Sequence, residues 1–400
     1  MEKKKQLLIL LLIAVLGVTM TGCTTYDNFK TAFFSSDKSD DTIKIGVLQP
    51  LSGVYKELGI QELEGIRLAN KLYPKVNGKK VELIEADSQG SIYVAESVVK
   101  DLVNKKPTMV IGSHGDAVTL TAAKELEKAK IPGISASATN PLISENHDYY
   151  AQVSFTDADQ SKAIAKFMRE ELEVTKAAVV RTEGDTQCSE MARSFKKAFT
   201  ADLGEEAEGS VKTVKLEIKE KNYDAYLKEI KKAGIKAVFA PVSVEEAGKL
   251  FASAEKLKME DVTFIGPVSW DTKEMAKLQK KHSDVKVMMA ADFGSKTDND
   301  NDEYEKFVKA FKKEYGKEPT EINARAYDAY MIAMETLKNG TKKNGKLKDG
   351  EALMEELLAI EDFPAVTGNI SFDKNGKAVK TIKIDELKDG KFTTVYTVEN

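Results

Sequence analysis

The chain has 400 residues, with 60 Lys and Arg residues against 64 Asp and Glu residues and a formal net charge of −4. Basic and acidic residues are mixed along the chain and form no concentrated basic patch, so nucleic acid is not an expected partner. The mildly acidic balance indicates a soluble surface and says little more about function.

The N-terminus has the layout of an export signal. Three lysines, Lys3 to Lys5, precede an apolar run from Leu7 to Val18, and the sequence M-T-G-C ends at Cys23. A charged start, a short apolar core and small residues before a cleavage point are typical of a signal peptide, whereas a membrane span needs about 20 apolar residues. We therefore predict that residues 1–22 are removed as a signal peptide.

The T-G-C ending resembles the processing site of bacterial lipoproteins, although Met20 stands where such sites more often carry Leu. The resemblance implies that Cys23 becomes the acylated first residue of an extracytoplasmic protein anchored to the cell membrane. Each buried acyl methylene contributes about 0.8 kcal/mol, so two or three acyl chains hold a protein firmly. The alternative is an ordinary secretory cleavage in which Cys23 has no role.

Residues 23–41 are expected to form a flexible tether, because they lack sustained hydrophobic periodicity and end in Ser and Asp. With Cys23 committed to lipid, Cys188 has no partner for an intramolecular disulfide, and the exported body must be held by its core. We interpret Cys188 as a small buried residue rather than a reactive thiol.

From residue 42 to residue 150, strand-like segments alternate with amphipathic helical segments. Strands are expected at 42–50, 80–87, 108–112 and 131–136, and helices at 62–72, 94–103 and 119–129. Repeated alternation of this kind predicts a parallel sheet covered by helices.

The pattern begins again after residue 150. Strands are expected at 176–181, 211–218, 236–240 and 262–266, and helices at 189–201, 223–233 and 244–257. Residues 300–340 are mainly helical, and 368–398 are strand-rich, with hairpin turns at D-K-N-G-K (373–377) and K-D-G-K (388–391). Two doubly wound α/β blocks therefore follow one another, and they suggest a cleft between them.

Three segments that follow strands of the first block are rich in Gly, Ser and Thr, and each precedes a helix. They lie at 49–59, 111–119 and 135–141. Backbone N–H groups at a helix N-terminus suit carboxylates and other anions. The alternative role of such segments is helix capping alone.

Six segments occur in a recognisable order along the chain. They are K-I-G-V-L-Q-P-L-S-G (44–53), A-D-S-Q (86–89), I-G-S-H-G (111–115), I-S-A-S-A-T-N-P (134–141), F-V-K-A-F-K-K-E-Y-G-K-E-P (307–319) and A-Y-D-A-Y (326–330). Together they resemble the leucine/isoleucine/valine-binding family, the extracytoplasmic substrate-binding proteins of branched-chain-amino-acid-type ABC transporters. The resemblance runs from Lys44 to Phe372, nearly the whole mature chain.

The resemblance implies the type I periplasmic binding protein fold, an α/β fold with two doubly wound parallel-sheet lobes joined by three hinge crossings. It places the crossings near 151–156, 288–294 and 364–370. Lobe 1 is then expected to comprise residues 42–153 and 290–366, and lobe 2 residues 154–289 and 367–400.

The resemblance also implies that a ligand is clamped between the lobes. It places Asp116 at a Ser that holds the ligand's carboxylate, and Ala138 and Thr139 in the small-residue loop that holds it too. Gln187 aligns with a family Tyr, and Val268 with the acid that binds the ligand's amino group. The expected ligand-binding residues are Asp116, Ala117, Ser137, Ala138, Thr139, Gln187, Ser243 and Trp270.

Two of these positions depart from the family pattern. An ionised Asp116 only accepts hydrogen bonds and repels a carboxylate, and Val268 offers no partner to an ammonium group. We therefore expect either a polar neutral or cationic solute, held by Asp116, Thr139 and Gln187, or another binding orientation. The alternative is that Asp116 only caps a helix that begins near Ala117.

Trp270 is expected to form a stacking wall for the ligand, because it follows a strand end. The alternative is a structural role in the core, which is common for a lone Trp.

The expected function is that of a lipid-anchored, extracytoplasmic solute-binding protein of an ABC importer, which binds an amino acid or a related small polar molecule. We expect a monomer that docks on a membrane permease. The alternatives are a ligand sensor of the same fold coupled to signalling and, less in keeping with the sequence, an extracytoplasmic enzyme.

No catalytic activity, cofactor or metal is expected. The chain has no G-x-S-x-G motif, no G-x-G motif and no nucleophile–base pair at a telling spacing. The three histidines, His114, His147 and His282, do not show an H-x-x-x-H spacing.

Overall fold

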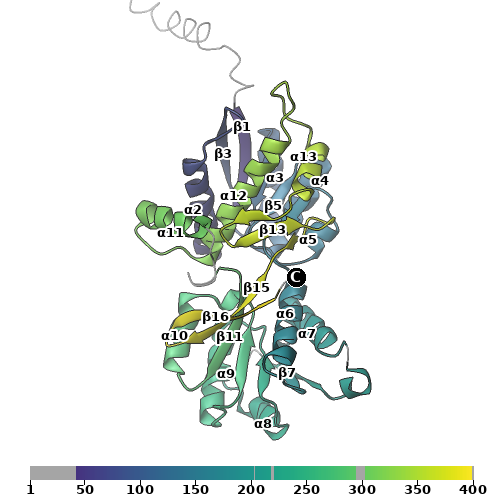
Figure 1. Ribbon diagram of the computed structural model, residues 1–400, viewed down its shortest axis with the longest axis vertical. Coiled ribbons are helices and arrows are strands. Elements are labelled where there is room, and N and C mark those ends of the chain that lie inside the picture. The colour runs from purple at the N-terminus through teal and green to yellow at the C-terminus, as the bar shows by residue number, and fades with distance from the viewer. Residues whose placement is uncertain (1–41, 202, 218–219, 294–301, 399–400) are drawn as a thin grey trace, which may run out of the picture. The chain divides into compact units, whose positions relative to one another are not determined.

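Alternating strands and helices build two separate β-sheets in the computed structural model, which describes residues 42–201, 203–217, 220–293 and 302–398 (Figure 1). The predicted signal peptide, Cys23 and the tether lie outside the described residues. Within the described part of the chain, no helix combines the length and the apolarity needed to cross a membrane.

The first sheet has six strands in the order β2-β3-β1-β4-β5-β6. Its strands are β1 Thr42–Gln49, β2 Lys75–Val76, β3 Lys79–Asp87, β4 Met109–Gly112, β5 Gly133–Ser135 and β6 Tyr150–Gln152. β1, β4, β5 and β6 pair in parallel, and β2 pairs antiparallel with β3. The loops that follow β1, β4 and β5 therefore lie at one edge of the sheet.

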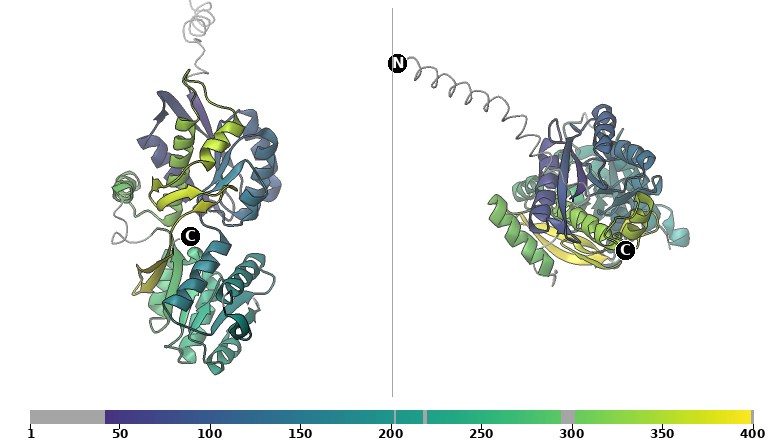
Figure 2. Two further views of the ribbon diagram at one scale, coloured as in Figure 1. Left: turned by 45° about the vertical axis from the view of Figure 1, so that its right-hand side comes forward. Right: turned by 90° about the horizontal axis from the view of Figure 1, so that it is seen from above.

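Helices from two distant parts of the sequence accompany the first sheet (Figures 1 and 2). They are α2 Lys56–Leu72, α3 Ile92–Asn104, α4 Asp116–Ala129, α5 Leu142–Glu145, α11 Asp302–Tyr315, α12 Glu321–Asn339 and α13 Gly350–Leu358. α3 packs on α4, and α2 packs on α12. Gly65 permits the second contact, because a Cβ there would clash with the carbonyl oxygen of Asn323. We call this assembly the first lobe.

The second sheet has seven strands in the order β16-β15-β11-β10-β9-β7-β8. Its strands are β7 Ala177–Thr182, β8 Val211–Leu216, β9 Ala237–Phe239, β10 Thr263–Gly266, β11 Lys286–Ala291, β15 Ile382–Lys388 and β16 Lys391–Val398. β7 to β11 pair in parallel, and β15 and β16 add an antiparallel edge.

Both faces of the second sheet are covered by helices, and together they form the second lobe. The helices are α6 Asp157–Glu170, α7 Thr186–Phe199, α8 Asp224–Lys232, α9 Val244–Lys256 and α10 Lys273–Lys281, with the short 3₁₀ helices η1 Gly204–Ala207 and η2 Val268–Trp270. Alternate residues of β7 belong to the hydrophobic cores on the two faces of the sheet. Val179 packs with α6 and α7, whereas Val180 packs with α8 and α9. This burial on both faces explains the continuous apolar run of the strand.

A small antiparallel sheet is formed by the chain between α13 of the first lobe and β15 of the second sheet. It consists of β12 Phe363–Ala365, β13 Gly368–Phe372 and β14 Ala378–Val379. β12 and β13 contact α12 and α13 of the first lobe, and the chain enters the second sheet at Ile382. We therefore propose that the third crossing lies near residue 380 rather than at 364–370.

The predicted strands and helices are confirmed, with a few differences in extent. α2 begins at Lys56, earlier than the predicted start at 62. The elements that were not predicted include α6, α10, α13, β6 and β11. β11 (K-V-M-M-A-A) is rich in Met and Ala, which carry little strand preference. Both C-terminal hairpin turns are confirmed, between β13 and β14 and between β15 and β16.

Candidate functional site

Asp116 is the first residue of α4, and its carboxylate joins α4 to the loop after β5. Oδ1 of Asp116 accepts hydrogen bonds from the backbone N–H groups of Thr139, at 2.9 Å, and Asn140, at 3.3 Å. The N-cap of α4 is Gly115, which makes no side-chain cap bond. The interpretation that Asp116 only caps a helix beginning near Ala117 is therefore wrong, since its carboxylate binds a different loop. Ala117 itself is exposed.

The loop after β5 is held by its own polar groups. The N–H of Ala138 donates to Oγ of Ser135 at 3.1 Å. The carbonyl of Ala138 accepts from Nε2 of Gln152 at 2.9 Å and from Oγ of Ser154 at 2.7 Å. Oγ of Ser137 is buried and has no hydrogen-bond partner within the described residues. The loop is thus a firmly positioned platform on the first lobe.

Gln187 brings the second lobe to this platform. It lies in the first turn of α7, and its Nε2 donates to Oγ1 of Thr139 at 3.4 Å. The same Nε2 donates to both carboxylate oxygens of Asp157, at 3.1 and 3.3 Å. Asp157 is the first residue of α6, directly after the chain leaves the first sheet. We give the name acidic cluster to four residues: Asp116, Thr139, Asp157 and Gln187. The cluster therefore contains residues of both lobes.

Asp157 is a buried carboxylate beside a second carboxylate. Asp157 is 7% exposed. Burial, and then the charge of Asp116, raise the pKa of Asp157 to about 7, although hydrogen bonds from Thr139 and Gln187 oppose the shift. Within the described residues, neither Asp116 nor Asp157 forms an ion pair with a basic side chain. Among the described residues, therefore, no cation compensates the carboxylates of the acidic cluster.

Sequence reasoning missed Asp157. The local signal was T-D-A-D, in which Thr156 and Asp159 form a capping box at the start of α6. That motif indicates a helix start, but only the fold shows that this start lies under the loop that carries Thr139.

Trp270 lies in the core of the second lobe. It is 0% exposed, its Nε1 donates to the carbonyl of Val242 at 2.7 Å, and its ring packs edge-to-face on Phe251 at 5.7 Å between centroids. Gly266 lies against the ring, since a Cβ there would overlap it. The stacking-wall prediction is corrected: the ring has no accessible face, and its role is structural.

Ser243 and Val268 make structural contacts, and Val268 is linked to Asp157 of the acidic cluster through Gln160. Ser243 is the exposed N-cap of α9, and its Oγ bonds Glu246 in a capping box. Val268 is buried, and its N–H donates to Oε1 of Gln160 at 2.9 Å. In the part of the chain that the structure describes, neither residue is hydrogen-bonded to Asp116, Thr139 or Gln187.

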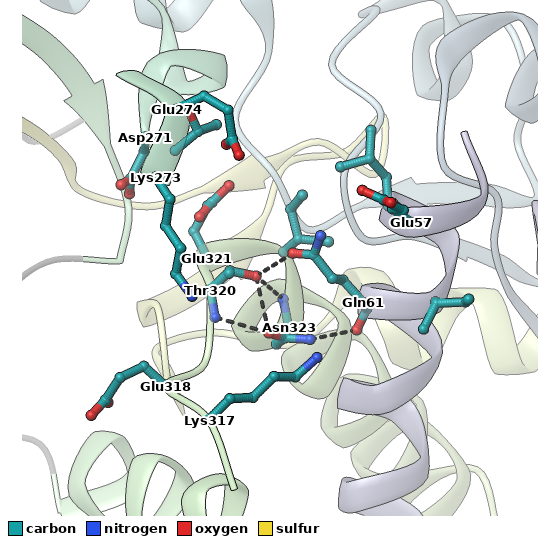
Figure 3. Close-up of a pocket in the computed structure, with 14 residues that line it drawn as sticks. Glu57, Gln61, Asp271, Lys273, Glu274, Lys317, Glu318, Thr320, Glu321 and Asn323 are labelled. Atoms are coloured by element: carbon teal, nitrogen blue, oxygen red, sulfur yellow. Dashed lines mark hydrogen bonds between the residues drawn. The ribbon is translucent and has the colours of Figure 1, made fainter. Parts of the chain in front are cut away.

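A cavity of about 360 Å³ lies between the two lobes (Figure 3). It is lined by Glu57, Leu58, Ile60 and Gln61 of α2, by residues 271–274, and by Lys317, Glu318, Thr320, Glu321, Ile322 and Asn323. None of the eight predicted ligand-binding residues lines this cavity, so the cavity and the acidic cluster are formed by different residues.

Carboxylates from both lobes face this cavity. Burial raises the pKa of Glu321 to about 7, against the opposing charge of Arg325. Burial and the charge of Glu321 raise the pKa of Asp271 well above its usual value. Nη2 of Arg325 approaches Oε1 of Glu321 only to 4.0 Å, because the guanidinium also binds Asp292.

His114 links the first-lobe loops to the buried end of α2. The ring Nδ1 of His114 lies 2.9 Å from Oε1 of Glu62, and the backbone N–H of His114 donates to Oε1 of Gln49 at 3.0 Å. Nε2 of Gln49 donates to Oε2 of Glu62 at 2.7 Å. The three side chains fix the position of the loop that precedes α4.

Cys188 is buried, as predicted, and forms no disulfide within the described residues; burial raises the pKa of its thiol to about 11. In the part of the chain that the structure describes, no group of three or more His, Cys, Asp or Glu residues is arranged to hold a metal ion.

Comparison with known proteins points to one family. The model of a family described as periplasmic binding protein matches residues 42–391. The leucine-, isoleucine-, valine-, threonine-, and alanine-binding protein of Pseudomonas aeruginosa is 26% identical, over 86% of this chain and 89% of that protein. The leucine-binding protein LivK of Thermotoga maritima has a TM-score of 0.76 and 25% identity, covering 89% of this chain and 99% of that one. The branched-chain amino acid transporter substrate-binding protein LivJ of Streptococcus pneumoniae, in complex with isoleucine, has a TM-score of 0.74 and 24% identity, covering 90% and 100%.

Proposed function

The chain belongs to the periplasmic binding protein family, and on this premise we propose that it is the extracytoplasmic solute-binding component of an ABC importer. The similarity to amino-acid-binding relatives supports a solute that is an amino acid or a related small polar molecule. The protein's part in transport is binding, without chemical change of the solute.

One observation carries the proposal: polar side chains of both lobes meet in a single cluster. Asp116 and Thr139 come from the first lobe, and Gln187 reaches them from the second. We propose that these residues and Asp157 hold the solute, with Ala117, Ser137 and Ala138 completing the first-lobe side. A solute that contacts both lobes stabilises their closed arrangement, because it binds that arrangement better than an open one.

The hinge that such closure needs lies where the chain passes between the lobes. Nζ of Lys380 contacts Oδ2 of Asp292 at 3.2 Å and donates to Oγ1 of Thr367 at 2.6 Å. Asp292 follows β11, whereas Lys380 precedes β15, so this buried pair joins the second and third crossings. It supports a motion in which the crossings bend together.

We further propose that the mature protein is a monomer anchored to the cell membrane through acylated Cys23. The anchor keeps the two lobes beside a membrane permease, on which the closed form docks. The spacing of Lys3, the apolar run and Cys23 supports this arrangement.

Native mass spectrometry of freshly purified full-length protein tests the proposed function. We expect a small molecule bound at one copy per chain, released on unfolding. Small-angle scattering before and after removal of that molecule is expected to show a larger radius of gyration without it. A protein that carries no small molecule, and whose radius of gyration no added solute changes, would contradict the proposed function.

A further inference from the structure

We infer that the solute is a small organic cation, such as a primary amine, that carries no carboxylate group. This inference rests on the proposed function, since it names the chemical class of the solute in the proposed site. Three observations carry it: the amide groups beside Asp116 are already used, Asp157 is buried without a basic partner among the described residues, and the interlobe cavity has an excess of acids.

The first observation concerns the backbone donors of the loop after β5. The N–H groups of Thr139 and Asn140 both donate to Oδ1 of Asp116. A solute carboxylate in this position needs the same donors, and it meets a like charge there. The carboxylate of Asp116 thus already accepts the two backbone N–H groups that the carboxylate of a zwitterionic amino acid requires.

The second observation concerns Asp157. Its carboxylate is nine-tenths buried and receives hydrogen bonds from the neutral amides of Gln187, at 3.1 and 3.3 Å, and Gln160, at 3.4 Å. No lysine, arginine or histidine among the described residues forms an ion pair with it. A buried carboxylate is strongly stabilised by a hydrogen-bonded cation, and an ammonium group of the solute supplies that cation.

The third observation is independent of the acidic cluster. The interlobe cavity is lined by five carboxylates, Glu57, Asp271, Glu274, Glu318 and Glu321, against the ammonium groups of Lys273 and Lys317. Figure 3 shows Glu321 within this space, with Asp271 and Glu57 on either side of it. The side chain of Glu321 is only 7% exposed, and Nη2 of Arg325 lies 4.0 Å from its Oε1. Both parts of the interlobe region therefore favour positive charge.

Matched pairs of molecules that differ in one carboxylate test the inference. The pairs are 3-methylbutylamine and leucine, cadaverine and lysine, and agmatine and arginine. Calorimetric titration of the full-length protein is expected to show at least tenfold tighter binding of one or more amines than of the corresponding amino acid. Tighter binding of the amino acids, or no binding of any of the six probes, overturns the inference.

The two failures are distinguishable. If an amino acid binds more tightly than its amine, the inference is wrong and the proposed solute-binding function stands. If no probe binds, native mass spectrometry decides about the proposed function separately, because it detects any retained solute whatever its charge.

Asp116→Ser assigns the effect to the acidic cluster, because the change removes the carboxylate and frees two amide groups. We expect at least a tenfold loss of amine affinity and a gain of amino acid affinity. Asp157→Asn, which preserves the shape of the side chain, is expected to weaken amine binding by a similar factor. Asp101→Ser, on the exposed side of α3, is the matched control and is expected to bind as the unaltered protein does. Unchanged amine binding in both Asp116→Ser and Asp157→Asn overturns the inference.

Discussion

Nε2 of Gln187 in α7 donates a hydrogen bond to Oγ1 of Thr139, which belongs to the opposite lobe, at 3.4 Å. This distance is long for a hydrogen bond, whereas the contact with Asp157, at 3.1 Å, is closer to the usual range. Gln187 therefore belongs to the second lobe by its stronger contacts and touches the first lobe only weakly. A solute between the lobes can take over the weaker contact at little cost.

Gln187→Ala is expected to weaken solute binding. The change removes the amide that we propose holds the solute, and a hydrogen bond to a charged group contributes about 1.5–3 kcal/mol, or roughly a tenfold to hundredfold change in Kd. The dissociation constant of the retained solute, measured by calorimetric titration, checks the result. Lys197→Ala, on the exposed face of the same helix, serves as the control. Equal affinities of the two variants would show that Gln187 does not contact the solute.

Asp157 is expected to make stability depend on pH. Its folded-state pKa, about 7, lies above the usual 3.8, so the folded protein binds this proton more tightly than the unfolded chain does. The stability that the proton contributes is complete below about pH 4 and is lost as the pH rises through about 7. Burial raises this pKa most; the charges of Asp116 and Asp185 also raise it, and hydrogen bonds from Thr139 and Gln187 lower it.

Asp157→Asn isolates this contribution, since the amide cannot ionise. Between pH 5 and pH 8, the free energy of unfolding of the solute-free protein is expected to fall relative to that of the variant, by up to a few kcal/mol. Urea denaturation at four pH values measures the difference. Glu321 and Asp328 titrate in both proteins, so their effects cancel. Parallel pH profiles would mean that Asp157 has an ordinary pKa.

The sequence predicted most of the fold because its signals are local. The apolar segments 176–181 and 236–240 form β7 and β9, and the Gly-containing turns of the C-terminal hairpins lie where expected. Asp116 and Thr139 come together because each follows a parallel strand of the first sheet, and the ends of such strands share one edge. Gln187 follows β7 of the second sheet and reaches Thr139 from the other lobe.

The remaining features depend on contacts between distant segments. Asp157 lies under the first-lobe loop only because the chain crosses between lobes just before α6. Trp270 is buried because Gly266 and Phe251 make room for its ring, which no sequence spacing indicates. The interlobe cavity combines α2 with the start of α12, two segments far apart in the chain.

Trp270→Ala is expected to destabilise the second lobe and to leave the solute preference unchanged. Truncation of a buried aromatic side chain costs about 3–5 kcal/mol, through lost burial and the cavity left behind. Urea denaturation measures the loss, and Trp270→Phe, which keeps most of the ring volume, is expected to retain more of the stability. A folded Trp270→Phe protein that had lost solute affinity would restore the stacking role.

Cys23→Ala tests the membrane anchor. Without the thiol no thioether-linked lipid forms, and the protein is expected to move from the detergent phase to the aqueous phase in Triton X-114 partitioning. Mass spectrometry of the unaltered protein is expected to show a lipid mass on Cys23 and cleavage after residue 22. Cys188→Ala is the control, because this buried thiol lies in the folded body. An unaltered protein that partitions into the aqueous phase would refute lipidation.

Lys380→Met is expected to loosen the hinge. Lys380 is 3% exposed and contacts Asp292 and Thr367, while Asp328 accepts the N–H groups of Val366 and Thr367. Removing the ammonium group leaves Asp292 with Arg325 as its remaining charged partner, at 3.3 Å. Breaking a buried ion pair in this way costs about 3–5 kcal/mol, which urea denaturation measures.

The same variant separates a hinge role from a purely structural one. The charges of Lys380 and Arg325 hold the pKa of Asp292 below its usual range despite burial, so the pair contributes stability that is lost as the pH falls through that lowered pKa. Lys380→Met is expected to raise this pKa and to shift the loss of stability to higher pH. Lys388→Met, at an exposed strand end, is the control. If Lys380→Met changes stability but leaves the change in radius of gyration on solute binding intact, the crossings do not bend through this pair.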